Sequence, residues 1–348
     1  MKPHKFSCTF VQKADFFELV YGEEMRAEIA SRVTVLGDVV EGTQLASREQ
    51  DLAQSDFIFT GWGAPSINDL LPYCPRVKAI FFAGGTASYM LNPEIWRRGI
   101  QVSSAYAANA VPVAEYTLAA ILLGLKGGWR AISDVKIAHH YHRRKDVPGA
   151  YGATVGLISC GAIARELLRL LRVFDLRPIV YDPYLSAEEI RNLGAEPADL
   201  EEIFRRSDVV SLHSPELEET RGMIRRNHFA AMKPGATFIN TARGAIVNEE
   251  ELCAVARERP DLQFVLDVVH PEPPLKDSAL FDLPNVMVTP HIAGAMGREC
   301  RRMGQYMVEE LDRYLAGEPL RWEITPGLAA RSIHRPDFMR TPGTLSAV

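Results

Sequence analysis

Three polar residues, Arg243, Glu272 and His291, each follow the end of a predicted strand. The three strands are residues 236–240, 263–268 and 286–289. An arginine binds a carboxylate bidentately and polarises an adjacent carbonyl, and a histidine exchanges protons near neutral pH. A neighbouring carboxylate orients such an imidazole and favours its charged form. Because parallel strands end at one sheet edge, the three side chains can converge on one small molecule. Each also has a purely structural interpretation, as a helix cap, a loop residue or a structural histidine.

The segment from Thr154 to Asp182 is the element around which these residues must be arranged. It reads as a strand, a turn of small residues, an amphipathic helix and a second strand. This order is typical of the βαβ unit that binds a dinucleotide pyrophosphate at a helix N-terminus. The usual G-x-G-x-x-G fingerprint appears here as Ser159, Gly161 and Ala164, so only the middle glycine is kept. A plain structural turn remains an open alternative.

Asp182 favours the nucleotide interpretation. It lies 18 residues after Ala164, at the end of the second strand. A carboxylate there accepts both ribose hydroxyls of NAD and repels the 2′-phosphate of NADP. The expected cofactor is therefore NAD, although Arg177 could weaken this preference by reaching a phosphate.

The remaining pattern predicts an α/β protein. Strand-like runs alternate with helical segments on both sides of the nucleotide unit, which indicates parallel sheets. Additional strands are expected at 6–11, 33–39, 56–62, 77–82 and 208–212, with helices at 15–30, 44–53, 109–126, 200–206, 249–258 and 298–315. The helix 109–126 should start near Pro112 in its first turn. Its apolar surface is wide enough to contact a second subunit.

Composition excludes several classes of protein. A length of 348 residues suggests two domains, and a net charge of −5 argues against nucleic acid as a partner. Five scattered cysteines without a C-x-x-C motif predict reduced thiols in a cytoplasm, with neither disulfides nor a metal site. The N-terminus lacks the apolar core of a signal peptide. The longest apolar run, Leu118–Leu125, is too short to span a membrane.

Two further segments each have two interpretations. Gly84, Gly85 and Thr86 follow a strand directly, so their amides either bind an anion or form an ordinary turn. Residues 139–146, HHYHRRKD, either bind an acidic group or form a solvated loop.

The chain resembles the D-isomer-specific 2-hydroxyacid dehydrogenases from Val77 to Gly294. Three motifs are the most specific: MKPGATFINTARGAIVNEEEL, LDVVHPEP and NVMVTPHIAG. The resemblance implies a flavodoxin-like substrate domain (1–108 plus 296–325), a Rossmann NAD-binding domain (109–295), a cleft between them and a tail (326–348). Such proteins are usually homodimers through their cofactor domains, and they interconvert small 2-oxo and D-2-hydroxy acids.

The resemblance also implies roles for individual residues. Catalysis falls to Arg243, Glu272 and His291, and Asp267 should hold the nicotinamide carboxamide. Substrate contacts fall to Gly84, Gly85, Thr86 and Arg243. The implied cofactor contacts are Ser159, Cys160, Gly161, Ala162, Ile163, Asp182, His213, Pro215, Thr220, Thr241, Ala242, Asp267, His291 and Gly294.

This sequence departs from the family pattern at two places. Ser159 replaces the first fingerprint glycine, which bears on cofactor affinity, and Asn248 replaces an aspartate that caps a helix. A second function is also compatible with the motifs: an NAD(H)-sensing binding protein of the corepressor type, which shares the same fold and catalytic residues.

Overall fold

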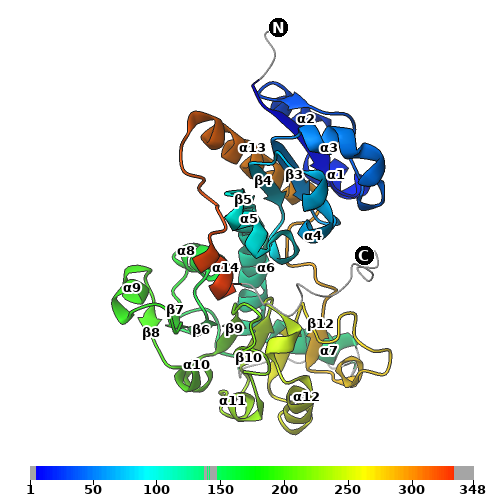
Figure 1. Ribbon diagram of the computed structural model, residues 1–348. Coiled ribbons are helices and arrows are strands. Elements are labelled where there is room, and N and C mark those ends of the chain that lie inside the picture. Colours follow the sequence, from blue (N-terminus) through cyan, green and yellow to red (C-terminus); the bar gives the residue numbers. More distant parts are fainter. Residues whose placement is uncertain (1–4, 137–138, 140, 142–146, 333–348) are drawn as a thin grey trace. The chain divides into compact units, whose positions relative to one another are not determined.

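The computed structural model describes residues 5–136, 139, 141 and 147–332. Most of the basic segment 139–146, and the tail from residue 333 onward, lie outside the described residues. The chain divides into two compact units: unit 1 is Met1–Asn109 with Ala295–Val348, and unit 2 is Ala110–Gly294 (Figure 1).

Unit 1 is built on a five-stranded sheet. All of its pairings are parallel, in the order β2-β1-β3-β4-β5, which is the flavodoxin-like order. The strands are β1 (Ser7–Val11), β2 (Thr34–Val35), β3 (Phe57–Gly61), β4 (Ala79–Ala83) and β5 (Gln101–Ser104). The helices are α1 (Ala14–Val20), α2 (Gly22–Ala30), α3 (Glu49–Gln54), α4 (Ile67–Leu70), α5 (Pro93–Arg97), α13 (Cys300–Ala316) and α14 (Pro326–Ser332).

Both faces of this sheet are buried, because side chains along a strand alternate in direction. Phe57 and Phe59 of β3 pack in one cluster with residues of α1, α2 and α13. Ile58, between them, packs in another cluster with Ile67 and Ile95 from α4 and α5. A strand buried on both sides reads as a continuous apolar run, which is the signal that predicted it.

Helix α13 returns from the far end of the chain to cover one face of unit 1 (Figure 1). Met303, Met307 and Leu311 repeat at helical spacing and are fully buried against the sheet. Glu310 is buried as well, and its carboxylate accepts hydrogen bonds from the Ser103 hydroxyl (2.5 Å) and the Arg321 and Trp322 amides. The carboxylate therefore ties the segment after α13 back to β5.

The first residues of the predicted tail form helix α14 (Pro326–Ser332). Leu328 and Ala329 of this helix pack against the second cluster of unit 1.

Unit 2 contains a seven-stranded parallel sheet in the order β12-β11-β10-β9-β6-β7-β8. Counted from β6, this is the Rossmann order 3-2-1-4-5-6 with β12 added at one edge. The strands are β6 (Thr154–Ile158), β7 (Arg177–Tyr181), β8 (Glu196–Pro197), β9 (Val209–Leu212), β10 (Thr237–Asn240), β11 (Gln263–Leu266) and β12 (Val286–Val288). The helices are α6 (Tyr106–Leu125), which begins in unit 1, α7 (Gly128–Lys136), α8 (Ala162–Leu171), α9 (Ala187–Asn192), α10 (Leu200–Arg206), α11 (Arg226–Ala230) and α12 (Glu249–Glu258).

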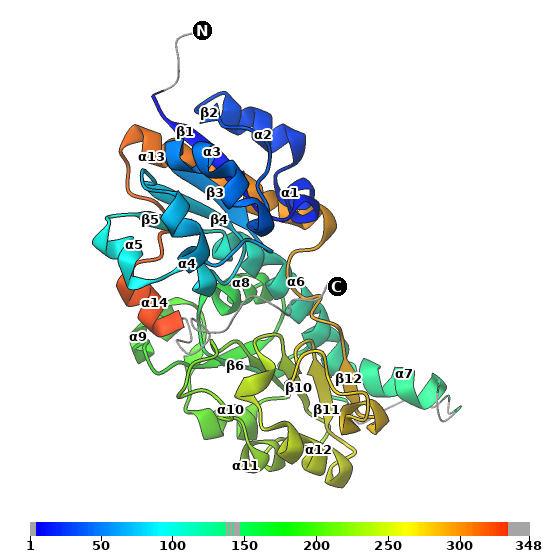
Figure 2. The ribbon, with the colours of Figure 1, turned by 45° about the vertical axis from the view of Figure 1, so that its right-hand side comes forward.

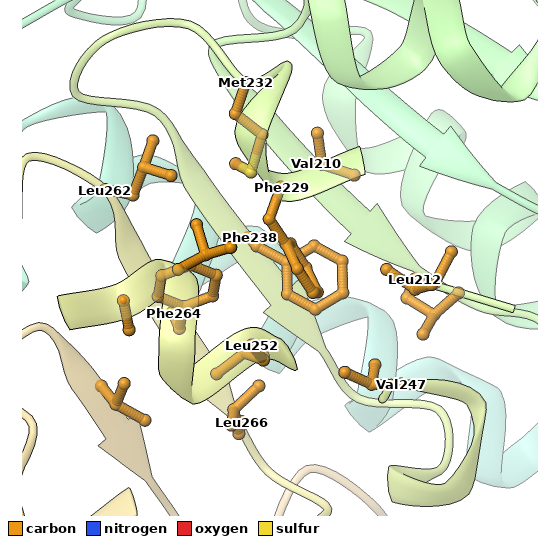
Figure 3. Packing of buried hydrophobic residues seen from close by; sticks show 14 of the residues in the cluster. Val210, Leu212, Phe229, Met232, Phe238, Val247, Leu252, Leu262, Phe264 and Leu266 are labelled. Atoms are coloured by element: carbon orange, nitrogen blue, oxygen red, sulfur yellow. The ribbon is translucent and has the colours of Figure 1, made fainter. Parts of the chain in front are cut away.

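An aromatic cluster fills one face of this sheet (Figure 3). Phe229 of α11 meets Phe238 of β10 and Phe264 of β11 edge to face, at ring-centroid distances of 5.2 and 5.5 Å. Such contacts add to the stabilisation from area burial. The two sheets confirm the predicted α/β class with two doubly wound parallel sheets.

Several local features differ from those predicted. Strands β5 and β8 were not predicted, because β5 contains two serines and β8 has only two residues. The helix expected at 15–30 is divided into α1 and α2, because Gly22 has a φ of +54° that a continuous helix does not allow.

Helix α6 begins at Tyr106, so Pro112 lies inside it and not in its first turn. The ring of Tyr106, the first residue of the helix, packs edge to face on Trp322 of the return segment. Proline there cannot donate the hydrogen bond that a helix interior normally has.

Among the described residues, α6 is the one helix long and apolar enough to cross a membrane. Ala114, Ile121 and Leu125 are buried in the core of unit 2, and Thr117 hydrogen-bonds Thr241. We therefore interpret α6 as a core helix.

Candidate functional site

His291 and Glu272 form a hydrogen-bonded pair in unit 2. Nδ1 of the imidazole lies 2.6 Å from Oε1 of the carboxylate, and both side chains are about half exposed. Since an ionised carboxylate only accepts, Nδ1 carries the proton of this bond. Nε2 is then the ring nitrogen that is left to accept a hydrogen bond.

The loop that carries His291 is held by Asp267, which follows β11. The buried carboxylate accepts hydrogen bonds from the Thr289 hydroxyl (2.7 Å) and from the amides of Ile292 and Ala293 (both 2.9 Å). The backbone carbonyl of Asp267 also accepts from the His291 amide. These bonds hold His291 at a φ of +54°, a conformation that non-glycine residues rarely adopt.

Helix α6 supports the same loop through Tyr116. The Thr289 hydroxyl gives its hydrogen to Asp267, so the Tyr116 hydroxyl must donate to Thr289, at 2.9 Å. Neither Tyr116 nor Thr289 was predicted from the sequence to belong to the site. The run of polar residues from Glu115 to Thr117 in a mostly apolar helix is the signal that would have drawn attention to α6.

Arg243 lies in the turn after β10, at the same edge of the sheet. Its Nη1 donates to the Ala242 carbonyl (2.6 Å), and Asn240 bridges the turn by contacting the Arg243 carbonyl and the Ala242 amide. Burial lowers the pKa of Arg243, and the carboxylates of Glu216 and Glu272 oppose this shift. The guanidinium remains charged, and poor solvation strengthens its attraction for an anion.

The nucleotide turn between β6 and α8 has its own supports. Ser159 adopts a φ of +71°, and its hydroxyl lies 2.7 Å from that of Ser214, which follows β9. This contact spans β6 and β9, where the strand order reverses. Ser214 was not expected to contribute, although it stands between the predicted cofactor residues His213 and Pro215.

Gly161 is the N-cap of α8, and a Cβ added to it would meet no atom within 4 Å. The space in front of this helix N-terminus is therefore open, as the binding of a pyrophosphate there requires. The Cys160 amide donates to Asp182 Oδ2 (2.7 Å) and the Tyr184 amide donates to Oδ1 (2.8 Å). Each oxygen of Asp182 keeps acceptor capacity for a ribose hydroxyl. Arg177 is at the opposite end of β7, about 16 Å away along the strand, so it does not compete at this place.

The other predicted cofactor residues of unit 2 also follow strand ends. His213, Pro215 and Thr220 follow β9; the Thr220 hydroxyl donates to the Pro215 carbonyl. Burial lowers the pKa of His213 to about 4, so this ring is neutral. Ala162 and Ile163 are in the first turn of α8, Thr241 and Ala242 follow β10, and Gly294 ends the His291 loop.

The predicted substrate residues Gly84, Gly85 and Thr86 follow β4 in unit 1. The Gly84 amide donates to the Phe82 carbonyl, so this N–H is not available to a ligand. The Ser104 hydroxyl contacts the carbonyls of Gly84 and Gly85, at 3.0 and 2.9 Å. This turn can therefore offer an anion the Gly85 amide but not that of Gly84.

Two smaller expectations concern other sites. The Asn248 side chain accepts from the Glu251 amide (3.1 Å), so it caps α12 as predicted. Within the described ranges, no group of three or more histidine, cysteine or acidic residues is arranged to hold a metal ion.

The sequence and the fold are similar to those of known dehydrogenases. The model of the NAD binding domain of D-isomer specific 2-hydroxyacid dehydrogenases matches residues 119–293. The (S)-sulfolactate dehydrogenase of Chromohalobacter salexigens is 36% identical over 62% of this chain and 70% of its own length. The D-3-phosphoglycerate dehydrogenase of Methanocaldococcus jannaschii is 29% identical over 81% of this chain, which spans about half (54%) of that relative's length. A phosphoglycerate oxidoreductase structure from Rhizobium etli has the same fold, with a TM-score of 0.77 and 22% identity, covering 92% of this chain and 98% of that one.

The Ser159–Ser214 contact predicts how cofactor affinity responds to substitution. Ser159→Ala keeps the strained Cβ and loses a hydrogen bond of about 1 kcal/mol, so NADH binding should weaken about five-fold. Ser159→Gly loses the bond but relieves about 1 kcal/mol of strain, so the Kd should stay within about two-fold of the native value. Fluorescence titration with NADH measures both.

The matched control is Ser47→Ala, which removes an exposed serine of unit 1. It should leave the Kd for NADH unchanged. Equal affinities for the native protein and Ser159→Ala, or weaker binding by Ser159→Gly than by Ser159→Ala, would contradict the role of the contact.

Proposed function

The chain belongs to the D-isomer specific 2-hydroxyacid dehydrogenase family, and on that premise we propose that it interconverts a 2-oxo acid and a D-2-hydroxy acid with NAD. The observation that carries the proposal is the His291–Glu272 pair, which lies at the same sheet edge as Arg243 and the nucleotide turn. Unit 2 is the NAD-binding domain. We assign substrate binding in part to unit 1.

Each residue of the proposed site has one chemical role. Arg243 binds the substrate carboxylate and polarises the adjacent carbonyl, because its guanidinium is cationic and poorly solvated. His291 donates a proton through Nε2 to the carbonyl oxygen during reduction and takes it back during oxidation. Glu272 fixes the orientation of that ring. NAD, when bound, supplies or accepts the hydride.

The cofactor would be held along the carboxyl edge of unit 2. The amides of Gly161, Ala162 and Ile163 would face the pyrophosphate, because those of Ser159 and Cys160 already donate to the Tyr181 carbonyl and to Asp182. Asp182 would accept from the ribose. Asp267 was expected to hold the nicotinamide carboxamide. Three donors already occupy its carboxylate, two of them on Oδ1, so Oδ2 offers one further acceptor position for that amide.

One prediction concerns the transfer of a proton between His291 and the substrate. His291→Gln should lower kcat by about 10² to 10⁴, because general acid–base catalysis is lost. Glu272→Gln keeps an acceptor for Nδ1 but not the charge, and should cost about ten-fold. Arg243→Ala should raise KM and lower kcat together, because one residue holds the carboxylate and polarises the carbonyl. Steady-state rates with NADH and a panel of 2-oxo acids measure these changes.

His270→Gln is the matched control, since this histidine is exposed and stands two residues from Glu272. It should leave kcat near native. Near-native reduction by His291→Gln would remove His291 from the proposed mechanism. If the native protein binds NADH tightly but turns over no 2-oxo acid of the panel, the NAD(H)-sensing alternative gains support.

Another prediction concerns the preference for NAD over NADP. The Asp182 carboxylate repels a 2′-phosphate, so kcat/KM should be at least about ten-fold higher with NADH than with NADPH. Asp182→Ser removes the charge and should shrink this ratio. Equal values for the two cofactors with the native protein would be the contrary result.

We also propose that the protein forms a homodimer through α6 and α7. Ile132 and Val135 on α7 are 46% and 44% exposed, and Leu118 and Leu122 of α6 are only partly buried. Figure 2 shows α7 projecting from the body of unit 2. Light scattering at micromolar concentration should give twice the chain mass of 38.7 kDa, and the Ile132→Asp/Val135→Asp variant should give a single chain. A single-chain mass for the native protein would rule out the dimer.

A cytoplasmic location also remains our proposal. All five cysteines are buried and unpaired, which suits a reducing compartment.

A further inference from the structure

Two consecutive residues of α6, Tyr116 and Thr117, contact two separate loops at the carboxyl edge of the sheet in unit 2. The Tyr116 hydroxyl lies 2.9 Å from the Thr289 hydroxyl, in the loop after β12. The Thr117 hydroxyl lies 3.2 Å from the Thr241 hydroxyl, in the turn after β10. Adjacent side chains on a helix point about 100° apart, so two neighbours can reach different loops. One short stretch of helix therefore contacts both loops on which the proposed acid–base and carboxylate-binding residues stand.

The sheet alone does not fix the spacing of these two loops. Arg243 and His291 each stand three residues beyond the last residue of a strand, since β10 ends at Asn240 and β12 ends at Val288. Strand β11 lies between β10 and β12, so the ends of these two strands are about 10 Å apart. The ladder of hydrogen bonds fixes the strands, whereas residues three positions further on depend on additional contacts.

Helix α6 is a firm support for such contacts. Ala114, Ile121 and Leu125 are fully buried in the core of unit 2, and Thr117 is fully buried as well. Elements with many buried contacts open less often than loops do. The helix therefore gives both loops one common point of reference.

The hydrogen bonds on the His291 side have a fixed direction. Burial and the nearby charge of Asp267 raise the pKa of Tyr116, so its hydroxyl keeps the proton that it donates to Thr289. The Thr289 hydroxyl in turn donates to the Asp267 carboxylate (2.7 Å). The Asp267 carbonyl accepts from the His291 amide. A chain of contacts thus connects α6 to the backbone of His291.

The turn that carries Arg243 is attached to the same helix. The Thr241 hydroxyl is buried, and its hydrogen bond to Thr117 ties the start of the turn to α6. Asn240 braces the rest of the turn through the Ala242 amide and the Arg243 carbonyl. The backbone from which the guanidinium extends is therefore fixed relative to the helix.

We propose, on the basis of the function proposed above, that Tyr116 and Thr117 are a positioning pair that fixes the separation between Arg243 and His291. In a 2-oxo acid the carboxylate and the carbonyl are on adjacent carbon atoms. The group that binds one and the group that protonates the other therefore tolerate little error in their spacing. A misplacement of about 1 Å can cost about 100-fold in rate. Tyr116 acts on the proton donor and Thr117 on the arginine, so the loss of each has a different kinetic effect.

Steady-state kinetics at saturating NADH test this division, with whichever of glyoxylate, pyruvate and hydroxypyruvate the native protein reduces fastest. Tyr116→Phe should lower kcat about five-fold and leave KM unchanged, because His291 acts on the carbonyl oxygen in the transition state. Thr117→Val should raise KM about five-fold and lower kcat as well, because Arg243 holds the carboxylate in both states. Thr117→Ala serves as a second variant if the valine variant folds poorly.

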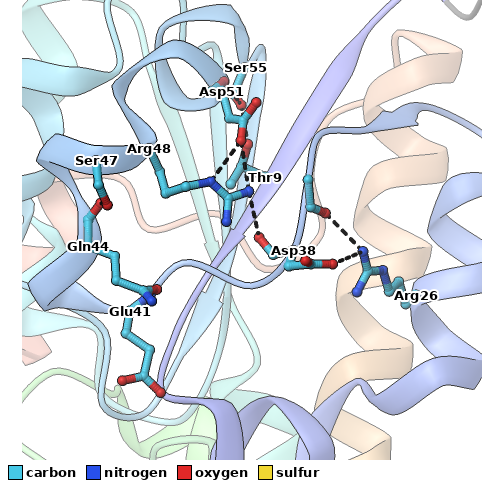
Figure 4. Close-up of polar contacts among 10 residues, drawn as sticks. Thr9, Arg26, Asp38, Glu41, Gln44, Ser47, Arg48, Asp51 and Ser55 are labelled. Atoms are coloured by element: carbon cyan, nitrogen blue, oxygen red, sulfur yellow. Dashed lines mark hydrogen bonds and ion pairs between the residues drawn. The ribbon is translucent and has the colours of Figure 1, made fainter.

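The matched control for a lost hydroxyl lies in unit 1, where the buried hydroxyls of Thr9 and Ser55 are 2.6 Å apart (Figure 4). Thr9→Val removes this bond and should lower the Tm about as much as Thr117→Val does, without changing kcat or KM. Tyr151→Phe, at a position that is 88% exposed, should change none of these values. If Thr9→Val altered the kinetics in the same manner, a general loss of stability would explain the effects and the proposal would be wrong.

Hydrogen exchange measured by mass spectrometry tests the positioning without turnover. Tyr116→Phe should speed exchange about five-fold in residues 289–294, and Thr117→Val should do the same in residues 240–246, with the rest of unit 2 unchanged. This pattern would support the positioning pair even if the native protein reduced no 2-oxo acid, in which case only the proposed function would fail. Native exchange in both loops, or faster exchange across all of unit 2, would overturn the inference. So would an active native enzyme whose kcat is unchanged in Tyr116→Phe and whose KM is unchanged in Thr117→Val.

Discussion

The carboxylate of Asp267 is the group on which the geometry of the site depends. It receives hydrogen bonds from the side chain of Thr289 and from the amides of Ile292 and Ala293, all within one short loop. A loop without regular structure would otherwise sample many conformations, and its entropy would oppose a single position for His291. Buried charge-assisted bonds are stronger than neutral ones. The carboxylate therefore replaces the hydrogen-bond ladder that a strand or helix would have provided.

The two side-chain supports of His291 come from outside its own loop. Tyr116 reaches Thr289 from α6, and Glu272 reaches the imidazole from the loop after β11. The ring of His291 is thus fixed through its Nδ1, while its backbone is fixed through Asp267. This division leaves Nε2 as the ring nitrogen without a structural partner among the described contacts, which suits the acid–base role that we propose for His291.

The parts of this protein that could be predicted from sequence are those with strong local patterns. Apolar runs such as those of β3 and β4 are buried on two faces, so they are continuous and easily identified. Arg243, Glu272 and His291 were found because each stands beside a glycine or proline just after such a run. The resemblance to a known family then gave these residues their expected roles.

Contacts between distant segments could not be predicted in this way. Ser159 and Ser214 are 55 positions apart, and only the strand order brings their hydroxyls together. Tyr106, the first residue of α6, contacts Trp322 more than 200 positions away, and such a contact is invisible to the local pattern that placed the helix start near Pro112. Gln12 looks like any polar residue after a strand, and only the three-dimensional arrangement shows that its amide is buried beside Gly61.

Unit 1 is assembled from two pieces of chain separated by the whole of unit 2, and this has a consequence for biosynthesis. A ribosome releases β1 to β5 well before it makes α13, so the sheet face that Met303, Met307 and Leu311 cover is exposed to the cell in the meantime. Exposed apolar surface of this kind promotes aggregation and is a target for chaperones. Unit 2, in contrast, is continuous and can fold as soon as Gly294 has emerged. The order of maturation is therefore the reverse of the order of synthesis: the inserted unit is completed first, and the unit that begins the chain is completed last.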